Sequence, residues 1–469
     1  MALGGYRELV PLDGAEALMW AARRDPLLSS AFITVTLLDG TPDHGALRSR
    51  LAGAVEETDR LRRRIVVPGG LLQGPAWEED PDFDLDNHLR RAVLPPPGTL
   101  RQLLDMAASE VEGGLDAERP PWRVTVVDGL EGPDGESAAL LAHLGHVLTD
   151  GEGGLRLSSR FLDLDEAGTA RASDALDRSR PAARRAPLPA GDGWSRLSAL
   201  ALGLWRGIVP EAPAPASRLV ETVLGREPLQ VAASLGRQLV VVDRSRSGLW
   251  RDRRSLRRRF EVASFDLDRV HRAGRRLRGT VNDAYVTAVV GGIAAYHRRF
   301  EAPLPDLRVA VPVSTREPGT TAANAFFPLR VVLPAGDEGP LSRFAAVHEA
   351  LDQAKAEPGL GAVGGLSGLL AFLPPPLLTE AARRQASTVD VAISNVSGSP
   401  VDLFVGGARI RATYPLGPTV ATALNATVLS YRSRLDMGLS CDAAAVDEPE
   451  ALRDCITAAM GALCEAAGV

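Results

Sequence analysis

A histidine and an aspartate four residues apart, His146 and Asp150, close an apolar segment and are followed by Gly151. The apolar residues 138–144 predict a buried strand that leads into an Asp-Gly turn. A histidine at the exit of such a strand can present a ring nitrogen to a cavity, while the turn aspartate bonds backbone groups and fixes the ring. Gly151 permits the positive φ that the turn needs. Strand alternation places Gly145 and His146 on opposite faces. The pattern indicates a rigidly held general base.

The motifs of several other catalytic classes are missing from the sequence. No G-x-S-x-G nucleophile elbow occurs, and no Gly-Lys pair is present to form a phosphate-binding loop. The Gly-rich stretch 151–156 lacks the last glycine of a dinucleotide fingerprint, because Arg156 stands there. The remaining chemistry is direct transfer, in which a base takes a proton from a bound acceptor that itself attacks. The alternative is that His146 is a satisfied core residue beside a common turn.

Composition narrows the class of protein. A chain of 469 residues, 45% hydrophobic and 24% charged, is globular and long enough for two domains. A net charge of −6 gives no electrostatic case for a nucleic-acid partner. The seven histidines are scattered, and the three cysteines fit neither a zinc site nor a disulfide framework, so we expect no metal and a reducing cytoplasm. No signal peptide and no bilayer-spanning apolar run is visible, so contact with a membrane is expected to be peripheral.

Helical and strand patterns alternate along the chain and predict two α/β halves with mixed sheets. We divide the chain into residues 1–164, which carry the histidine motif, a linker with connecting helices at 165–242, and a second half at 243–469. The expected helices are 12–20, 45–59, 99–115, 197–208, 218–242, 265–278, 281–300 and 449–467. The expected strands are 31–38, 65–67, 123–127, 138–144, 308–313, 327–333, 389–395, 423–429 and 436–440.

Residues 145–151 resemble the His-His-x-x-x-Asp-Gly motif of the bacterial wax ester synthase/diacylglycerol acyltransferase family, in the chloramphenicol acetyltransferase-like and condensation-domain superfamily. Other segments resemble elements of this family in the same order: 12–20 its opening helix, 83–88 with 97–98 its acidic segment, 120–122 its Pro-Leu-Trp element, 280–283 its Asn-Asp motif, 312–316 its Pro-Val-Ser-x-Arg strand end, 394–398 its Asn-Val-Pro-Gly turn, and 424–431 with Asp442 its C-terminal pattern. The resemblance covers nearly the whole chain. It departs from the pattern at Gly145, which replaces the first histidine, and at Ser397, which replaces the proline.

The resemblance implies two chloramphenicol acetyltransferase-like halves with an active-site tunnel between them. In that tunnel a fatty acyl group passes from acyl-CoA, the co-substrate, to the hydroxyl of a diacylglycerol or long-chain alcohol. The product is a triacylglycerol or wax ester, and neither a cofactor nor an acyl-enzyme takes part. His146 is the implied general base, and Asp150 orients the loop, with Arg316 as a candidate partner. The implied location is the cytoplasm, with peripheral contact at the inner face of the membrane or at lipid inclusions.

Asn282 and Asn395 are the candidates for contacting substrate or the oxyanion. Asn282 and Asp283 also stand in the first turn of a helix, where both residue types are favoured as caps, and for Asp283 structural support is the preferred interpretation. Two other functions stay open. One is an acyltransferase that tailors a specialised metabolite, and the other is a non-catalytic homologue that binds acyl chains, a hypothesis suggested by Gly145.

Overall fold

The computed structural model describes residues 8–67, 74–149, 151–173, 247, 249–250, 254–302, 304–314, 326–356, 379–380, 382–383, 386 and 388–469. The predicted helices at 197–208 and 218–242 lie outside these residues. The first part of the described chain forms β1 (Val10–Pro11), α1 (Gly14–Ala22), η1 (Pro26–Leu28), β2 (Phe32–Leu38), α2 (His44–Glu57), η2 (Asp59–Arg62), β3 (Arg63–Val66), β4 (Ala76–Glu79), η3 (Leu85–Asn87), β5 (Leu89–Val93), α3 (Leu100–Gly113), β6 (Trp122–Asp128), β7 (Ala138–Leu144) and α4 (Gly151–Ser159).

The second part of the chain begins with a strand and ends with a long helix. It comprises β8 (Arg258–Asp266), α9 (Leu267–Arg276), α10 (Val281–Arg299), β9 (Asp306–Ser314), β10 (Phe326–Pro334), α11 (Pro340–Lys355), β11 (Val391–Ser397), β12 (Phe404–Val405), β13 (Ala408–Leu416), β14 (Leu424–Tyr431), β15 (Arg434–Asp442) and α14 (Pro449–Ala466). All the expected strands are present, with ends shifted by a few residues. The helices α4 and α11 and the strands β1, β4, β5, β8, β12 and β13 were not predicted.

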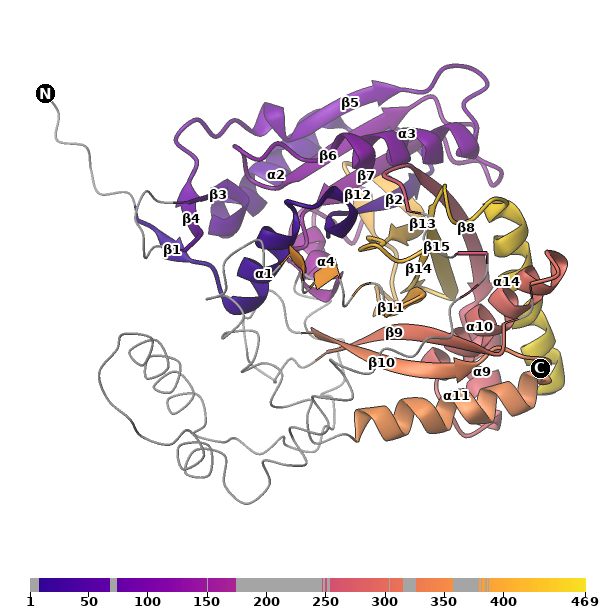
Figure 1. Cartoon of the computed structure of the whole chain (residues 1–469). Helices are drawn as coiled ribbons and strands as arrows, with labels where there is room; N and C mark the ends of the chain where they lie inside the picture. The colour runs from indigo at the N-terminus through magenta and orange to yellow at the C-terminus, as the bar shows by residue number, and fades with distance from the viewer. Residues whose placement is uncertain are drawn as a thin grey trace, which may run out of the picture.

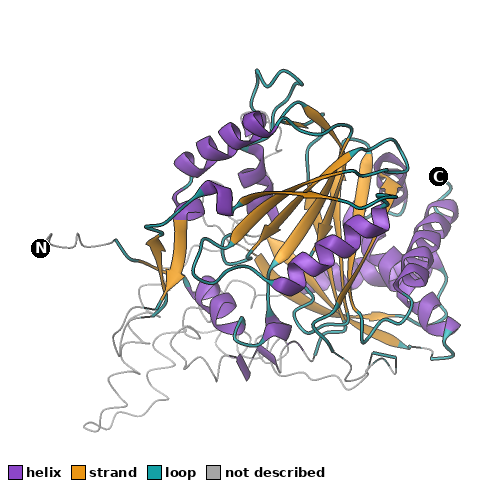
Figure 2. Cartoon of the chain, turned by 90° about the horizontal axis from the view of Figure 1, so that it is seen from above, coloured by secondary structure: helices purple, strands orange, loops and turns teal. Residues whose placement is uncertain are grey.

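Two six-stranded mixed sheets form the body of the molecule, as the α/β fold class predicted (Figures 1 and 2). The first sheet has the order β12-β13-β2-β7-β6-β5, and the second has the order β10-β9-β11-β14-β15-β8. The pairs β5–β6, β9–β11 and β11–β14 are parallel, and the other pairs in these two sheets are antiparallel. A small sheet, β1-β4-β3, stands beside the first.

The C-terminal half of the sequence contributes two strands to the first sheet. β13 pairs with β2, and β12 extends that edge of the sheet. In Figure 1 strand β13, coloured as a late part of the sequence, therefore lies beside β2, which is coloured as an early part. β13 then contacts β14 and β15, and the backbone N–H of Thr413 donates to the buried carboxylate of Asp436 at 3.0 Å. The halves therefore interlock through residues 404–416. The division at 164/165 and 242/243 stays a prediction.

Sequence features account for several of the helices. Helices α1, α3 and α10 each begin with a capping box, in which the side chains of Asp13, Thr99 and Thr280 accept a backbone N–H from the first turn. Helix α10 is apolar on almost every side, because it is packed against β11, α9, α11 and α14. Among the described residues, no helix is both long and apolar enough to span a bilayer.

Candidate active site

Strand β7 delivers the histidine motif from the centre of the first sheet. It pairs with β2 on one side and β6 on the other, and its residues are almost all buried. The strand ends at Leu144, so His146 lies in a turn, and the alternation predicted between Gly145 and His146 does not extend that far. The N–H of Leu148 donates to the carbonyl of Gly145 at 2.9 Å and closes this turn. His146 is half-buried, at the exit of a buried strand as expected.

The ring of Phe32 meets the imidazole of His146. Their centroids are 5.4 Å apart and their planes are inclined by 64°, which is an edge-to-face arrangement. Phe32 begins β2 and pairs with Leu144, the last residue of β7. The sequence predicted a strand that includes residue 32 but did not predict how this strand pairs with the strand before His146. Phe32 was therefore not identified as a neighbour of His146.

Helix α4 continues from the motif and reaches the second sheet. It begins at Gly151 and contacts β11, the strand that carries Asn395. The side chain of Asn395 is exposed, and its residue pairs with Val428 of β14. The structure therefore brings the segment that follows His146 next to the strand of one predicted asparagine, where the two sheets meet. Asp150 and Arg316 lie outside the described residues.

The Asn-Asp pair opens α10, where Thr280 is the N-cap. Thr280 Oγ1 accepts the N–H of Asp283 at 3.2 Å, and Asp283 Oδ2 accepts the N–H of Thr280 at 2.9 Å. Asp283 Oδ2 also lies 3.0 Å from His348 Nδ1 on α11. The carboxylate of Asp283 thus joins the start of α10 to α11, whereas Asn282 beside it is half-buried and takes no part in these cap bonds.

A second histidine of the same strand, His143, has a different environment. Its side chain is fully buried, and Nδ1 lies 4.0 Å from Glu110 Oε1 of α3. Burial, with a smaller contribution from the nearby Arg123 guanidinium, lowers the pKa of His143 to about 3. His143 is therefore a neutral core residue, whereas His146 is half-buried.

Trp122 is also a core residue. It is 4% exposed, and its Nε1 donates to the carbonyl of Leu61 at 2.9 Å. His88, in the acidic segment, is stacked between Trp122 and Phe83, and its Nδ1–H donates to the carbonyl of Trp122 at 2.7 Å. This segment therefore forms part of the packing beneath the first sheet.

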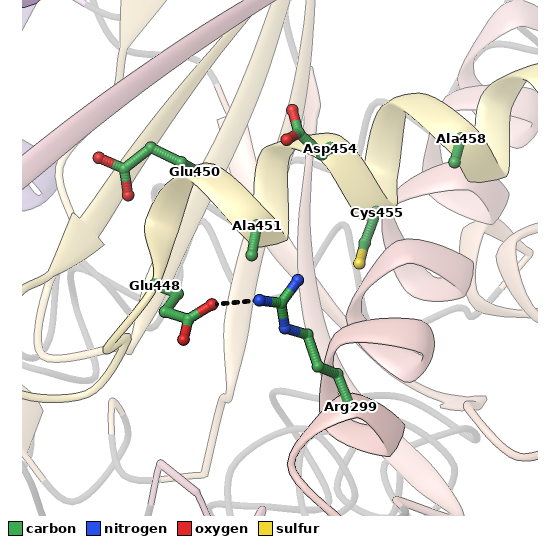
Figure 3. A pocket seen from close by; sticks show the side chains of 7 residues that line it. All are labelled: Arg299, Glu448, Glu450, Ala451, Asp454, Cys455 and Ala458. Carbon is green, nitrogen blue, oxygen red and sulfur yellow. Dashed lines mark ion pairs between the residues drawn. The ribbon is translucent and has the colours of Figure 1, made fainter.

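One cavity lies away from these residues, between the end of α10 and the start of α14 (Figure 3). It measures about 520 Å³ and is lined by Arg299, Glu448, Glu450, Ala451, Asp454, Cys455 and Ala458. Arg299 crosses it to pair with Glu448 at 2.8 Å. None of the predicted site residues lines it. Within the described part of the chain, no group of three His, Cys, Asp or Glu side chains could hold a metal ion.

Comparisons with known proteins agree with this arrangement. Residues 13–285 match the wax ester synthase/diacylglycerol acyltransferase catalytic domain, and residues 322–463 match the WS/DGAT C-terminal domain. A Mycobacterium tuberculosis H37Rv protein, provisionally named a diacylglycerol O-acyltransferase, is 32% identical over 98% of this chain and 92% of its own length. The O-acyltransferase WSD of Acinetobacter baylyi is 27% identical over 92% of both chains.

Solved structures share the fold. The wax ester synthase/diacylglycerol acyltransferase of Marinobacter aquaeolei VT8 superposes with a TM-score of 0.65 at 22% identity, over 98% of this chain and 100% of that chain. The first condensation domain of the CDA synthetase superposes with a TM-score of 0.58 at 16% identity, over 98% and 97% of the two chains. By its two matched domains and its full-length relatives, the chain belongs to the wax ester synthase/diacylglycerol acyltransferase family of O-acyltransferases.

Proposed function

We propose that this O-acyltransferase moves a fatty acyl group from acyl-CoA to the hydroxyl of a diacylglycerol or long-chain alcohol. The observation that carries the proposal is the position of His146, half-buried in the turn after β7, where α4 extends to β11 of the second sheet. A tunnel between the two halves would bring both substrates to this ring. The names of the relatives support this proposal: one is named a diacylglycerol O-acyltransferase, and the other, an O-acyltransferase WSD, supports O-acyl transfer.

In the proposed reaction His146 acts as general base. The imidazole takes the proton of the acceptor hydroxyl while that oxygen attacks the thioester carbonyl, a role that commonly contributes about 10²–10⁴-fold to rate. Because Nδ1 of His146 is buried, we assign the proton transfer to Nε2. The tetrahedral oxyanion then collapses, the C–S bond breaks, and the CoA sulfur leaves with the proton from the imidazolium. No acyl group is attached to the protein.

Preorganised donors must stabilise the oxyanion, and one such donor is typically worth about 3–4 kcal/mol. Asn282 and Asn395 are the proposed side chains. Asn282 is supported by its half-buried position and by the cap bonds that Thr280 and Asp283 make without it. Asp150 and Gly151 are proposed to shape the turn and the start of α4, with Arg316 and Asp283 as structural support.

We propose the cytoplasm as the place of this reaction, with the protein peripherally bound to the inner face of the membrane or to lipid inclusions. Exposed apolar side chains at the ends of strands β1 and β3 of the small sheet support such contact: Leu9 and Val10 are 40% and 38% exposed, and Val67 is 56% exposed. Flotation of the purified protein with lipid vesicles tests this part separately from catalysis.

The test of the activity follows free thiol and ester product with purified protein, long-chain acyl-CoA and a panel of diacylglycerols and alcohols. We expect thiol release from the wild type and from His271→Ala, an exposed control on α9. His146→Ala should lose at least about 10²-fold in rate. Undiminished release from His146→Ala, or a stable acylated protein, would overturn the mechanism. Acyl-CoA binding without release for any acceptor would favour a non-catalytic acyl-binding protein.

A further inference from the structure

Phe32 occupies a fixed place between the histidine turn and helix α4. As the first residue of β2 it pairs with Leu144, one step before the turn that holds His146. β2 lies inside the first sheet, between β13 and β7, and the ring of Phe32 is half-buried and packed against the core of that sheet. The scaffold therefore fixes the backbone of Phe32 more firmly than a loop could.

The far end of the Phe32 ring reaches α4 at a position without a side chain. A Cβ atom placed on Gly154 would lie 3.7 Å from Phe32 Cζ and 3.8 Å from Thr149 Cγ2. An added methyl group would thus be in ordinary van der Waals contact with the ring, and a longer side chain directed at the ring would have to displace it. The Phe32 ring therefore contacts the imidazole of His146 edge-to-face and lies within van der Waals reach of a Cβ atom at position 154.

We propose that Phe32 is a positioning residue that holds the imidazole of His146 in its productive orientation, with Gly154 leaving room for the phenyl ring. The inference rests on the proposed function, in which His146 is the base. An edge-to-face pair of rings is favoured beyond the burial of its apolar area. That preference favours one orientation of the imidazole over others. A catalytic group displaced by about 1 Å can cost about 10²-fold in rate.

The experiment compares Phe32→Leu, which keeps the apolar volume but removes the ring, with Phe32→Tyr, which keeps the ring. We expect Phe32→Leu to lower kcat by about 10–100-fold with KM for both substrates nearly unchanged, because only the orientation of the base is altered. Phe32→Tyr should restore kcat to within about threefold of the wild type. Gly154→Leu should reproduce the loss seen in Phe32→Leu, and Gly154→Ala should not.

The matched control is a second phenylalanine–histidine pair outside the site. Phe83 is half-buried and stacks on His88 with ring centroids 5.2 Å apart, so Phe83→Leu removes a phenylalanine–histidine contact of different geometry away from the site and should leave kcat unchanged. Thermal unfolding of each variant shows whether it is folded. A spectroscopic arm uses ¹³C-labelled histidine, in which the His146 ring signal should shift in Phe32→Leu and in Gly154→Leu but stay close to wild type in Phe32→Tyr.

The two proposals fail in different ways. If the wild type turns over, His146→Ala does not, and Phe32→Leu keeps its kcat, the positioning role is wrong while the function stands. A changed KM with an unchanged kcat would make Phe32 a substrate contact and would also overturn the positioning role. If the wild type shows no turnover with any acceptor, the proposed function fails. The His146 ring signal then still decides whether Phe32 orients that imidazole.

Discussion

The backbone N–H of Gly145 donates to the carbonyl of Pro121 at 2.8 Å, so the end of β7 is bound to the residue just before β6. A Cβ atom at position 145 would lie only 3.1 Å from Pro121 Cβ and 3.4 Å from its carbonyl oxygen. Gly145, which stands where the family pattern has its first histidine, is therefore in contact with Pro121, and the small residue leaves room for the proline ring.

We expect Gly145→Ala to reduce the free energy of unfolding by about 1–3 kcal/mol, the usual cost of overpacking. The proline ring and its carbonyl belong to a hydrogen-bonded backbone and have little freedom to withdraw. Pro121→Gly removes the Cβ atom in question, so the double variant should recover part of the loss. The coupling energy, expected at about 0.5–3 kcal/mol for residues in contact, is measured by urea denaturation of the four proteins.

Gly461→Ala is the control for this cycle, because a Cβ atom there meets no heavy atom within 4 Å. Gly461 lies inside helix α14, where alanine is favoured over glycine by about 0.5–1 kcal/mol, so this variant should gain stability. Additive effects of Gly145→Ala and Pro121→Gly would contradict a direct contact between the two positions.

A second prediction concerns His143 and the pH dependence of stability. Burial keeps the ring neutral in the folded state down to a pKa of about 3, whereas the unfolded chain takes up a proton near the ordinary value of 6.5. Between these pH values the unfolded state binds more protons, so the free energy of unfolding falls as the pH is lowered from 6.5 towards 3. At pH 5 this group alone should cost about 2 kcal/mol relative to neutral pH.

His143→Leu removes the titrating group. The loss in free energy of unfolding between pH 7 and pH 5 should therefore be about 2 kcal/mol smaller in this variant than in the wild type. Urea denaturation at the two pH values gives the change for wild type and variant, and only their difference is compared because other groups also titrate. His271→Leu, on the exposed face of α9, should keep the wild-type slope. An identical slope in His143→Leu and wild type would show that His143 is not buried as a neutral ring.

The sequence predicted those elements whose patterns are local. The strand before His146, its partner at 123–127 and the capped helix after Thr280 are present, because apolar runs, Asp-Gly turns and cap residues act over a few positions. The pairing of β13 with β2 was not predictable in this way, since nothing within residues 408–416 identifies a partner about 370 positions earlier. Helix α4 was also missed, because its glycine-rich start at 151–154 disfavours a helix by propensity.

The residues of the candidate site fall into the same two groups, those identified by local patterns and those placed by long-range pairing. His146 could be proposed from its motif, and the capping alternative for Asp283 followed from residue type and position. Phe32 and Pro121 could not be found from the sequence. Their places beside His146 and Gly145 depend on the strand register and on the turn that begins at Gly145, directly after the end of β7. The direction of the His146 side chain was out of reach for the same reason, since the rule of alternation ends with the strand.

The last prediction separates the two asparagines proposed for the oxyanion. Thr280 and Asp283 supply the cap bonds of α10, so Asn282→Ala should change the free energy of unfolding by less than about 0.5 kcal/mol. Loss of an oxyanion donor should nevertheless lower its kcat by about 10²–10³-fold. Thr280→Ala, which removes the cap, should show the opposite profile: a loss of about 1 kcal/mol in stability with kcat largely retained.

Asn395→Ala is the comparison within the second sheet. Its side chain is exposed, and a hydrogen bond in contact with water contributes less than one in a closed site, so we expect less than about tenfold loss of kcat. Steady-state kinetics with acyl-CoA and alcohol, together with urea denaturation, measure all three variants. The reverse ranking would move the oxyanion to β11. Near-normal kcat in both asparagine variants would assign the oxyanion to backbone N–H groups, because some donor must stabilise it in a direct transfer.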